Sequence, residues 1–250
     1  MAKKSTPVKE KFTITRQMLS MYNEIISQLP YVKGLIEIDV TDGRRIIKAY
    51  QEKTGERVSF TCWIMKCISE AIMENKIVHA YRIKKREIII PQEVNFGIMI
   101  ERETAVGMKV PYMAVIKQIE TKSVLEITTE IRKLQVEIIA EKDQLMGDQG
   151  FVRKLQMFLF SILPAFIGRP IFKKVSTNKK FVTENSGTVG MTSLGMFGKE
   201  VSGWAIHFPT RTVDFALGGI KEKPCIVDGK IVPRDILNLT IYIDHNIVDG

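Results

Sequence analysis

The sequence predicts an α/β fold in which helices pack on one mixed β-sheet to form a two-layer sandwich. Apolar residues in the segment 14–29 recur every three or four positions, the period of an amphipathic helix, and Pro30 ends the pattern. Residues 32–40 and 236–244 instead alternate apolar and polar side chains, which is typical of half-buried strands. Helical and strand segments of this kind follow one another along the chain, which is typical of an α/β fold. The chain has 250 residues, and 45% of its residues are hydrophobic, which suffices for one sizeable core.

The remaining segments extend this pattern. A second helix, within TDGRRIIKAYQEKTG, stops at Gly55, and Ser59 caps a third helix over 60–75 that we expect to bury Cys67. A long helix is expected over 123–144, and a hairpin turns at Asp228-Gly229. Further strands are expected around Pro91, where Val94, Phe96, Ile98 and Ile100 share one face, and over 106–115, broken by Pro111.

The chain is basic. Lys and Arg number 37 against 28 Asp and Glu, so the formal net charge is +9. A positive field favours anionic partners, although a solvated basic surface explains the same charge. The sequence has no nucleic-acid-binding motif and no metal-ligand spacing, so we expect neither nucleic acid nor a metal site.

The cysteines and the N-terminus bear on location and domain organisation. Three cysteines do not make a disulfide framework, and the basic opening segment MAKKSTPVKEKF lacks the apolar run of a signal peptide. We therefore expect a cytoplasmic protein with a flexible tail over 1–12 and a single domain over 13–250.

One apolar run breaks the pattern. Residues 155–168, LQMFLFSILPAFIG, are almost unbroken in apolar character and have basic flanks. A transmembrane helix needs about 20 apolar residues, and this run is shorter and contains Pro164. Three interpretations stay open: a buried or lid-like helical hairpin, a helix that contacts a membrane surface or a partner, and a true span.

Among the three histidines, His245 is the candidate for chemistry. His79 and His207 have no carboxylate or hydroxyl partner nearby in the sequence, whereas His245 directly follows an alternating strand in DHNIVDG. Asp244 is adjacent and Asp249 lies four residues on. An imidazole near neutral pH can act as a base, and a carboxylate can orient it or hold its loop. By spacing alone, a polar turn after an edge strand explains the motif equally well.

DHNIVDG resembles the DHRxxDG signature of the 2-oxo acid dehydrogenase acyltransferase catalytic domain, which shares its fold with chloramphenicol acetyltransferase. MTSLGMFG is similar to that family's SNLGMFG, and the segment from LGGIKEKPCIVDGK to DHNIVDG resembles its closing hairpin and catalytic strand. The resemblance covers about residues 13–145 and 183–250. An apolar insertion at about 146–182 is not part of the usual pattern.

The resemblance implies a mechanism. His245 would deprotonate a thiol, either coenzyme A or a reduced lipoyl group, and the thiolate would attack an acyl thioester. Thr192 matches the family's serine, an oxyanion donor, although a strand threonine without function is the alternative. Asp249 matches an aspartate that holds the active-site loop, and Ser193 occupies a substrate-binding position.

The family also implies partners. Coenzyme A would be a substrate, and this chain would carry no lipoyl group, so the acyl acceptor could be a lipoyl domain on another chain. The family forms trimers, which predicts a homotrimer with His245 facing Thr192 of another copy. Some of the basic residues are expected near the coenzyme A entrance: Lys84, Lys85, Arg86, Lys173, Lys174, Lys179 and Lys180.

Three departures from the family pattern leave other functions open. Asn246 replaces the arginine after the histidine, so any salt bridge of that arginine is missing; Ser193 replaces an asparagine; and the sequence ends at Gly250. A non-catalytic relative that serves as an assembly or interaction module is the main alternative. A membrane-surface acyltransferase, with contact through 155–168, is a third.

Overall fold

The computed structural model describes residues 9, 12, 14–103, 107, 109–137, 165–193 and 203–249. Within them, six strands form one sheet in the order β1-β8-β7-β6-β4-β5. Strands β4, β6 and β7 run parallel to one another, and the other neighbours are antiparallel, so the predicted mixed sheet is confirmed. The strands are β1 Tyr31–Asp39, β4 Phe96–Glu103, β5 Lys109–Ile116, β6 Val189–Ser193, β7 Val213–Val227 and β8 Lys230–Asp244; a separate hairpin pairs β2 Tyr81–Lys84 with β3 Glu87–Ile89.

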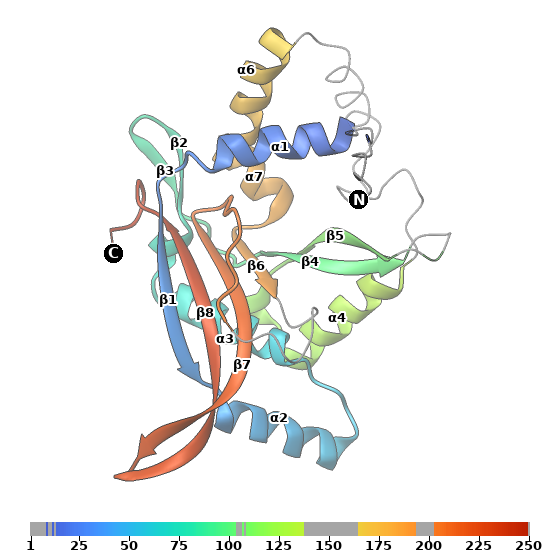
Figure 1. Cartoon of the computed structure of the whole chain (residues 1–250), viewed down its shortest axis with the longest axis vertical. Coiled ribbons are helices and arrows are strands. Elements are labelled where there is room, and N and C mark those ends of the chain that lie inside the picture. Colours follow the sequence, from blue (N-terminus) through green and yellow to red (C-terminus); the bar gives the residue numbers. More distant parts are fainter. Residues whose placement is uncertain are drawn as a thin grey trace, which may run out of the picture.

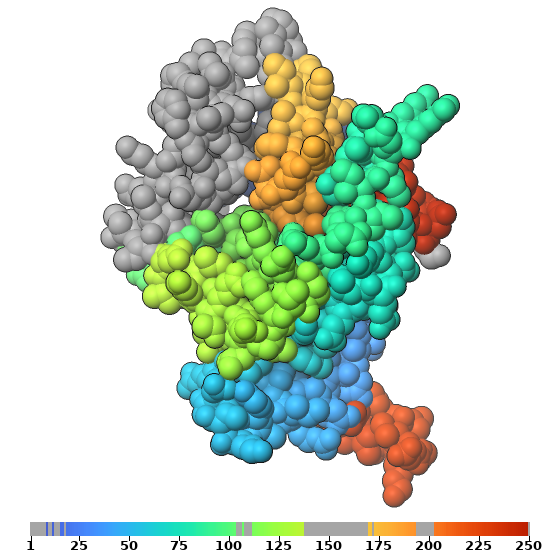
Figure 2. Space-filling model, turned by 180° about the vertical axis from the view of Figure 1, so that it is seen from behind, coloured from blue at the N-terminus to red at the C-terminus, as the bar shows by residue number. Residues whose placement is uncertain are grey.

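The helices form a second layer and a cap. Figure 2 shows α3 and α4 covering the sheet from behind, whereas α1, α6 and α7 gather at one end of the sheet in Figure 1. The described helices are α1 Ile14–Ile26, α2 Thr41–Thr54, α3 Phe60–Glu74, α4 Val124–Val136, α6 Ala165–Ser176 and α7 Lys179–Ser186, with 3-10 turns at Lys76–His79 and Ile119–Thr121. The predicted sandwich of helices on a sheet is therefore confirmed.

The main core lies between the sheet and the α3–α4 layer. Val94, Phe96, Ile98 and Ile100 are all buried there, as their alternation predicted. Helix α4 begins with a capping box, in which Ser123 and Glu126 each satisfy the other's backbone N–H. Strand β5 continues through Pro111 instead of breaking, because β5 is an edge strand and the missing N–H is tolerated there.

The buried face of α3 differs from the prediction. Cys67 is exposed, and the helix instead buries Cys62, Ile64, Met65, Ser69 and Ile72. Ile64 and Ile72 are buried as their spacing predicted, and the charged residues Lys66, Glu70 and Glu74 follow one another on the opposite side at intervals of four. Cys67, three residues before Glu70, lies on that charged side.

Several sequence predictions fall on residues that the structure does not describe. These include most of the 1–12 tail and residues 155–164 of the apolar run. The helix expected over 123–144 ends earlier, at Val136, where the backbone of Glu137 becomes extended; residues 138–144 lie outside the described part. Residues 165–168 open helix α6. No helix within the described ranges is long and apolar enough to cross a membrane.

The second face of the sheet is also buried, which the alternation in β8 did not predict. Asn238, Thr240, Tyr242 and Asp244 were expected to face solvent, yet all four are buried. The segment 203–212 covers them: the N–H of His207 donates to Tyr242 Oη at 2.7 Å, and the N–H of Asp244 donates to the carbonyl of Thr212 at 2.8 Å. A loop therefore encloses polar side chains that a two-layer fold would leave in water.

Arg211, near the end of the covering segment 203–212, forms a buried ion pair with Asp214 on β7. The side chains of Arg211 and Asp214 are 5% and 1% exposed, and their nearest charged atoms are 3.5 Å apart. A Cβ atom at Gly97 would lie 2.2 Å from Arg211 Nη2, and one at Gly190 would lie 2.5 Å from Nη1. Glycine at both positions is therefore what allows the guanidinium to cross β4 and β6.

The charge of Arg211 also sets the ionisation of its partner. Burial alone would raise the pKa of the Asp214 carboxyl, but the Arg211 guanidinium, the neighbouring His207 and the Thr210 N–H hold that pKa below its ordinary value. A depressed pKa in the folded state means that the carboxylate form stabilises the fold. That contribution is present above the unfolded pKa, near pH 4, and is lost as the pH falls through the folded pKa.

We predict that Asp214→Asn lowers the free energy of unfolding by about 3–5 kcal/mol at pH 7, because it leaves the buried Arg211 charge uncompensated. Urea unfolding at pH 7 and pH 4 measures this. The exposed Asp228→Asn is the control and should change stability by no more than about 0.5 kcal/mol. Equal stability of both variants would show that the ion pair does not support the fold.

Candidate active site

His245 directly follows β8, at the end of the sheet where α1 joins β1. Its backbone N–H donates to the carbonyl of Pro30 at 3.1 Å, and its side chain is about half exposed. Nδ1 lies 3.2 Å from the carbonyl oxygen of Val248. Because a carbonyl oxygen can only accept, this contact favours the tautomer with hydrogen on Nδ1 and leaves the Nε2 lone pair free as a base.

Asp244 shapes the turn that carries His245. Its Oδ1 accepts the backbone N–H of Asn246 at 3.1 Å and the side-chain amide of Asn246 at 2.9 Å. The backbone carbonyl of Asp244 accepts the N–H groups of Ile247 and Val248. Asp244 therefore organises the turn through both its side chain and its backbone.

Asp249 contributes less within one chain. Its side chain is fully exposed, and its Oδ1 lies 3.9 Å from His245 Nδ1. Within the described part of the chain, the turn is held by Asp244 and by the contacts of His245 with Pro30 and Val248. The loop-holding role expected for Asp249 stays a prediction.

Thr192 and Ser193 end strand β6 and line a pocket of about 430 Å³ between the sheet and helices α3 and α4. Its walls combine apolar side chains, such as Ile98 and Ile131, with hydroxyl groups and with Arg132. Such a mixture of apolar walls and a few polar groups is typical of a small-molecule site. The pocket thus lies at the end of β6, whereas the pairing of Thr192 with Ala216, and of Ala216 with Thr240, turns the Thr192 side chain toward the second face of the sheet.

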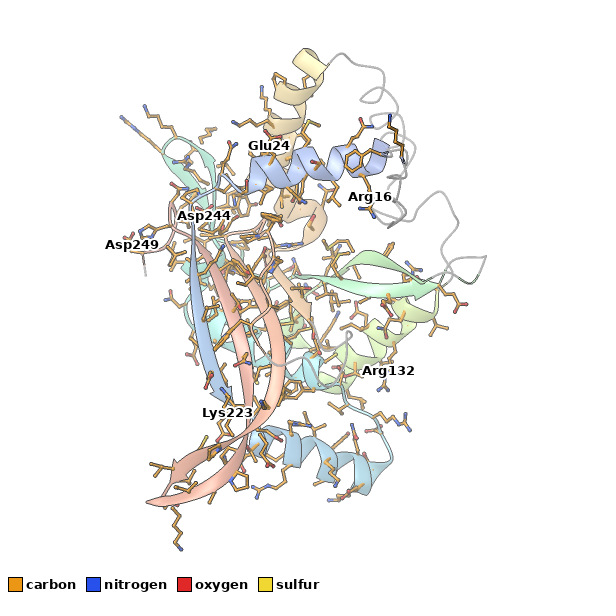
Figure 3. All side chains as sticks on the ribbon, viewed as in Figure 1. Arg16, Glu24, Arg132, Lys223, Asp244 and Asp249 are labelled. Atoms are coloured by element: carbon orange, nitrogen blue, oxygen red, sulfur yellow. The ribbon has the colours of Figure 1, made fainter. Side chains whose placement is uncertain are left out.

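His245 and Thr192 do not meet within one chain. Strand pairing aligns Thr192 with Ala216, and Ala216 with Thr240, which precedes His245 by five residues on β8. At about 3.3 Å per residue, the offset along the strand is roughly 16 Å. Figure 3 shows the same separation: Asp244 and Asp249 lie at one end of the sheet, and Arg132, which lines the pocket, lies on the far side of the molecule. Each chain therefore holds two separate halves of the predicted site.

The other two histidines have structural surroundings. His79 is buried, with Nε2 at 3.1 Å from the carbonyl of Pro91, and burial lowers its pKa. His207 packs its ring edge against Tyr242, with centroids 4.6 Å apart, and lies 3.8 Å from Asp214. Within the described ranges, no cluster of side chains could hold a metal ion.

Lys179 differs from the other basic residues expected near a coenzyme A entrance. Its ammonium lies 3.1 Å from Asp244 Oδ2, and its side chain is 15% exposed. Lys84 and Lys180 are exposed and lie near Glu87 and Glu184, as expected of surface residues. Lys179 is therefore a structural partner of the His245 turn and not part of a solvated basic surface.

Sequence reasoning missed Arg211 and Asp214. The available signal was a charge within an apolar strand, because Asp214 stands inside TVDFALGG. A charge there requires a nearby partner of opposite sign, since isolated buried charges are very costly. Arg211, three residues earlier, is that partner.

With this geometry established, the chain can be compared with known proteins. The family model described as 2-oxoacid dehydrogenases acyltransferase (catalytic domain) matches residues 5–146 and 174–250. A dihydrolipoyllysine-residue acetyltransferase component of the pyruvate dehydrogenase complex from Mycoplasma genitalium is 28% identical over 200 residues, which cover 79% of this chain and 41% of the relative. The chain spans less than half the length of the curated relatives it matches.

Solved structures show the same fold. A probable dihydrolipoamide acetyltransferase from Listeria monocytogenes aligns over 100% of this chain and 89% of its own, with a TM-score of 0.64 and 21% identity. The Azotobacter vinelandii dihydrolipoamide acetyltransferase, studied for the role of a serine, a histidine and an asparagine in its catalytic mechanism, aligns with a TM-score of 0.64 and 17% identity, covering 100% of this chain and 87% of its own.

The orientation of α3 can be tested by thiol labelling. Cys62 lines the pocket but is 1% exposed, whereas Cys67 is exposed. Burial raises the pKa of both thiols, so access of the reagent decides between them. A maleimide reagent at neutral pH should therefore label Cys67 at least about ten-fold faster than Cys62, as followed by peptide mass spectrometry. In urea both thiols are exposed and should react at similar rates; equal rates in the folded protein as well would contradict the observed face of α3.

Proposed function

The chain belongs to the family of 2-oxoacid dehydrogenase acyltransferase catalytic domains, and from that premise we propose that it transfers an acyl group between coenzyme A and a second thiol such as dihydrolipoamide. The observation that carries the proposal is the His245 imidazole, which stands at the end of the family's catalytic strand with Nδ1 engaged by Val248 and Nε2 free. Nε2 is then the base.

The proposed reaction exchanges one thioester for another. Nε2 of His245 takes the proton of the attacking thiol, and the sulfur forms a bond to the thioester carbonyl carbon. The tetrahedral oxyanion collapses, the bond to the original sulfur breaks, and the proton passes from His245 to the departing thiolate. A thiol has a pKa near 8.5, so a neutral imidazole is a suitable partner.

Thr192 is the proposed donor to the oxyanion. Thr192 matches the position of the family's serine, and the residue borders the pocket of about 430 Å³ at the end of β6. Threonine keeps the donor and adds a methyl group. Ser193, beside it in the same pocket, is proposed to contact the substrate through its own hydroxyl.

Because the two halves of the site lie far apart in one chain, catalysis requires a second copy. We propose a homotrimer in which His245 of one copy faces Thr192 of the next. The acyl acceptor is proposed to be a lipoyl domain on another chain.

The proposed function is tested by incubating the protein with acetyl-coenzyme A, or another acyl-coenzyme A, and dihydrolipoamide. Formation of S-acyl dihydrolipoamide is followed by chromatography, since the total number of thiols does not change. His245→Ala should lower turnover by about 10²–10⁴-fold. Thr192→Ala should lower it by about 10²–10³-fold.

Thr192→Ser is the matched control and should stay active, because it keeps the hydroxyl. Turnover that survives His245→Ala unchanged would contradict the mechanism. A wild-type protein that transfers none of several acyl groups would instead favour the non-catalytic assembly module.

A further inference from the structure

Lys179 is a buried cation that reaches from the start of α7 to the end of β8. An ammonium group has three hydrogen-bond donors, and all three have acceptors here. They are Asp244 Oδ2 at 3.1 Å, Tyr31 Oη at 2.6 Å and the carbonyl of Thr210 at 3.3 Å. Lys179 therefore has a single fixed position and no donor left for a ligand.

Asp244 links this cation to the turn of His245. Asp244 Oδ2 faces Lys179, and Asp244 Oδ1 accepts from the backbone N–H and from the side-chain amide of Asn246. The carboxylate is 6% exposed, so it depends on a nearby positive charge to remain inside the protein. The two oxygens thus join the charge on α7 to the backbone directly after His245.

The residue after His245 does not supply a positive charge. Asn246 donates hydrogen bonds to Asp244 but cannot neutralise it. The charge beside Asp244 comes instead from Lys179 on α7. Burial lowers the pKa of the Lys179 ammonium, and Asp244 opposes that shift, as expected for a cation held inside by its partner.

We propose that Lys179 is a positioning residue for His245, which neutralises Asp244 so that the Asp244–Asn246 turn presents the imidazole. This inference rests on the proposed function for its kinetic consequence, but its structural consequence can be measured without activity. Lys179 neither touches the substrate nor takes a proton in the reaction.

Lys179→Met tests this directly, with Lys180→Met as the matched control, because Lys180 is exposed and forms its ion pair with Glu184 on its own helix. We expect Lys179→Met to lower kcat by up to about 10²-fold, the effect of misplacing a catalytic group by about 1 Å. KM for the coenzyme A thioester should change less than about two-fold, since no binding group is lost. Lys179→Arg should restore most of kcat.

Hydrogen–deuterium exchange provides the readout that needs no activity. The N–H groups of Asn246, Ile247 and Val248 depend on Asp244, so their exchange should accelerate in Lys179→Met and stay unchanged in Lys180→Met. The double variant Lys179→Met with Asp244→Asn removes both charges and keeps an acceptor at position 244. It should return both kcat and exchange toward wild type, and it serves as the test protein if Lys179→Met does not fold.

Three results would overturn the proposal. One is exchange in Lys179→Met that matches Lys180→Met. Another is a raised KM with unchanged kcat, which would make Lys179 a coenzyme A-binding group. The third is a double variant that folds but regains neither kcat nor slow exchange. If the wild-type protein transfers no acyl group, the proposed function fails, while accelerated exchange confined to the His245 turn would still support the role of Lys179.

Discussion

A buried guanidinium lies across β4 and β6, where only glycine leaves room for it. Arg211 donates to the carbonyl oxygens of Ser186 and Gly187 and lies beside Asp214, so its charge and its donors are satisfied inside the protein. Gly97 and Gly190 provide the space. Buried ion pairs add little net stability, but removing one partner is costly. The pair therefore fixes the position of the 203–212 segment on the sheet more than it strengthens the fold.

Consecutive polar contacts connect Arg211 to the end of the sheet that carries His245. The carbonyl of Arg211 accepts from Tyr31 Oη, which in turn accepts from Lys179, and Lys179 neutralises Asp244. Asp244 then forms the turn of His245. The His245 turn is thus held by charges on α7 and on the second face of the sheet, whereas the pocket at the end of β6 lies against the apolar core on the opposite face. In the proposed mechanism these two halves of the site have separate supports in one chain, and a second copy brings them together.

The sequence predicted where the helices and strands lie better than it predicted which of their side chains are buried. Strong periodicity located α1, β4 and the turn at Asp228-Gly229, where both residues adopt positive φ as a tight hairpin requires. It failed for Cys67 on α3, which lies three residues before Glu70 on the charged side of that helix and is exposed. It failed for β8 because alternation cannot indicate that a distant loop will cover the polar face. His245 and Thr192 were found through motifs, but Lys179 is remote in sequence from Asp244, and its role depends on a tertiary contact that no local pattern encodes.

The central claim is that His245 and Thr192 from different copies make one site, and mixing two inactive variants tests it most directly. His245→Ala and Thr192→Ala are each purified, then co-refolded in equal amounts and assayed for acyl transfer. In a randomly mixed ring, about one site in four combines an intact His245 with an intact Thr192 of the neighbouring copy. The account predicts that the mixture recovers activity near that fraction of wild type, although each variant alone stays inactive. A co-refolded mixture that forms hybrid oligomers but remains as inactive as its components would contradict it.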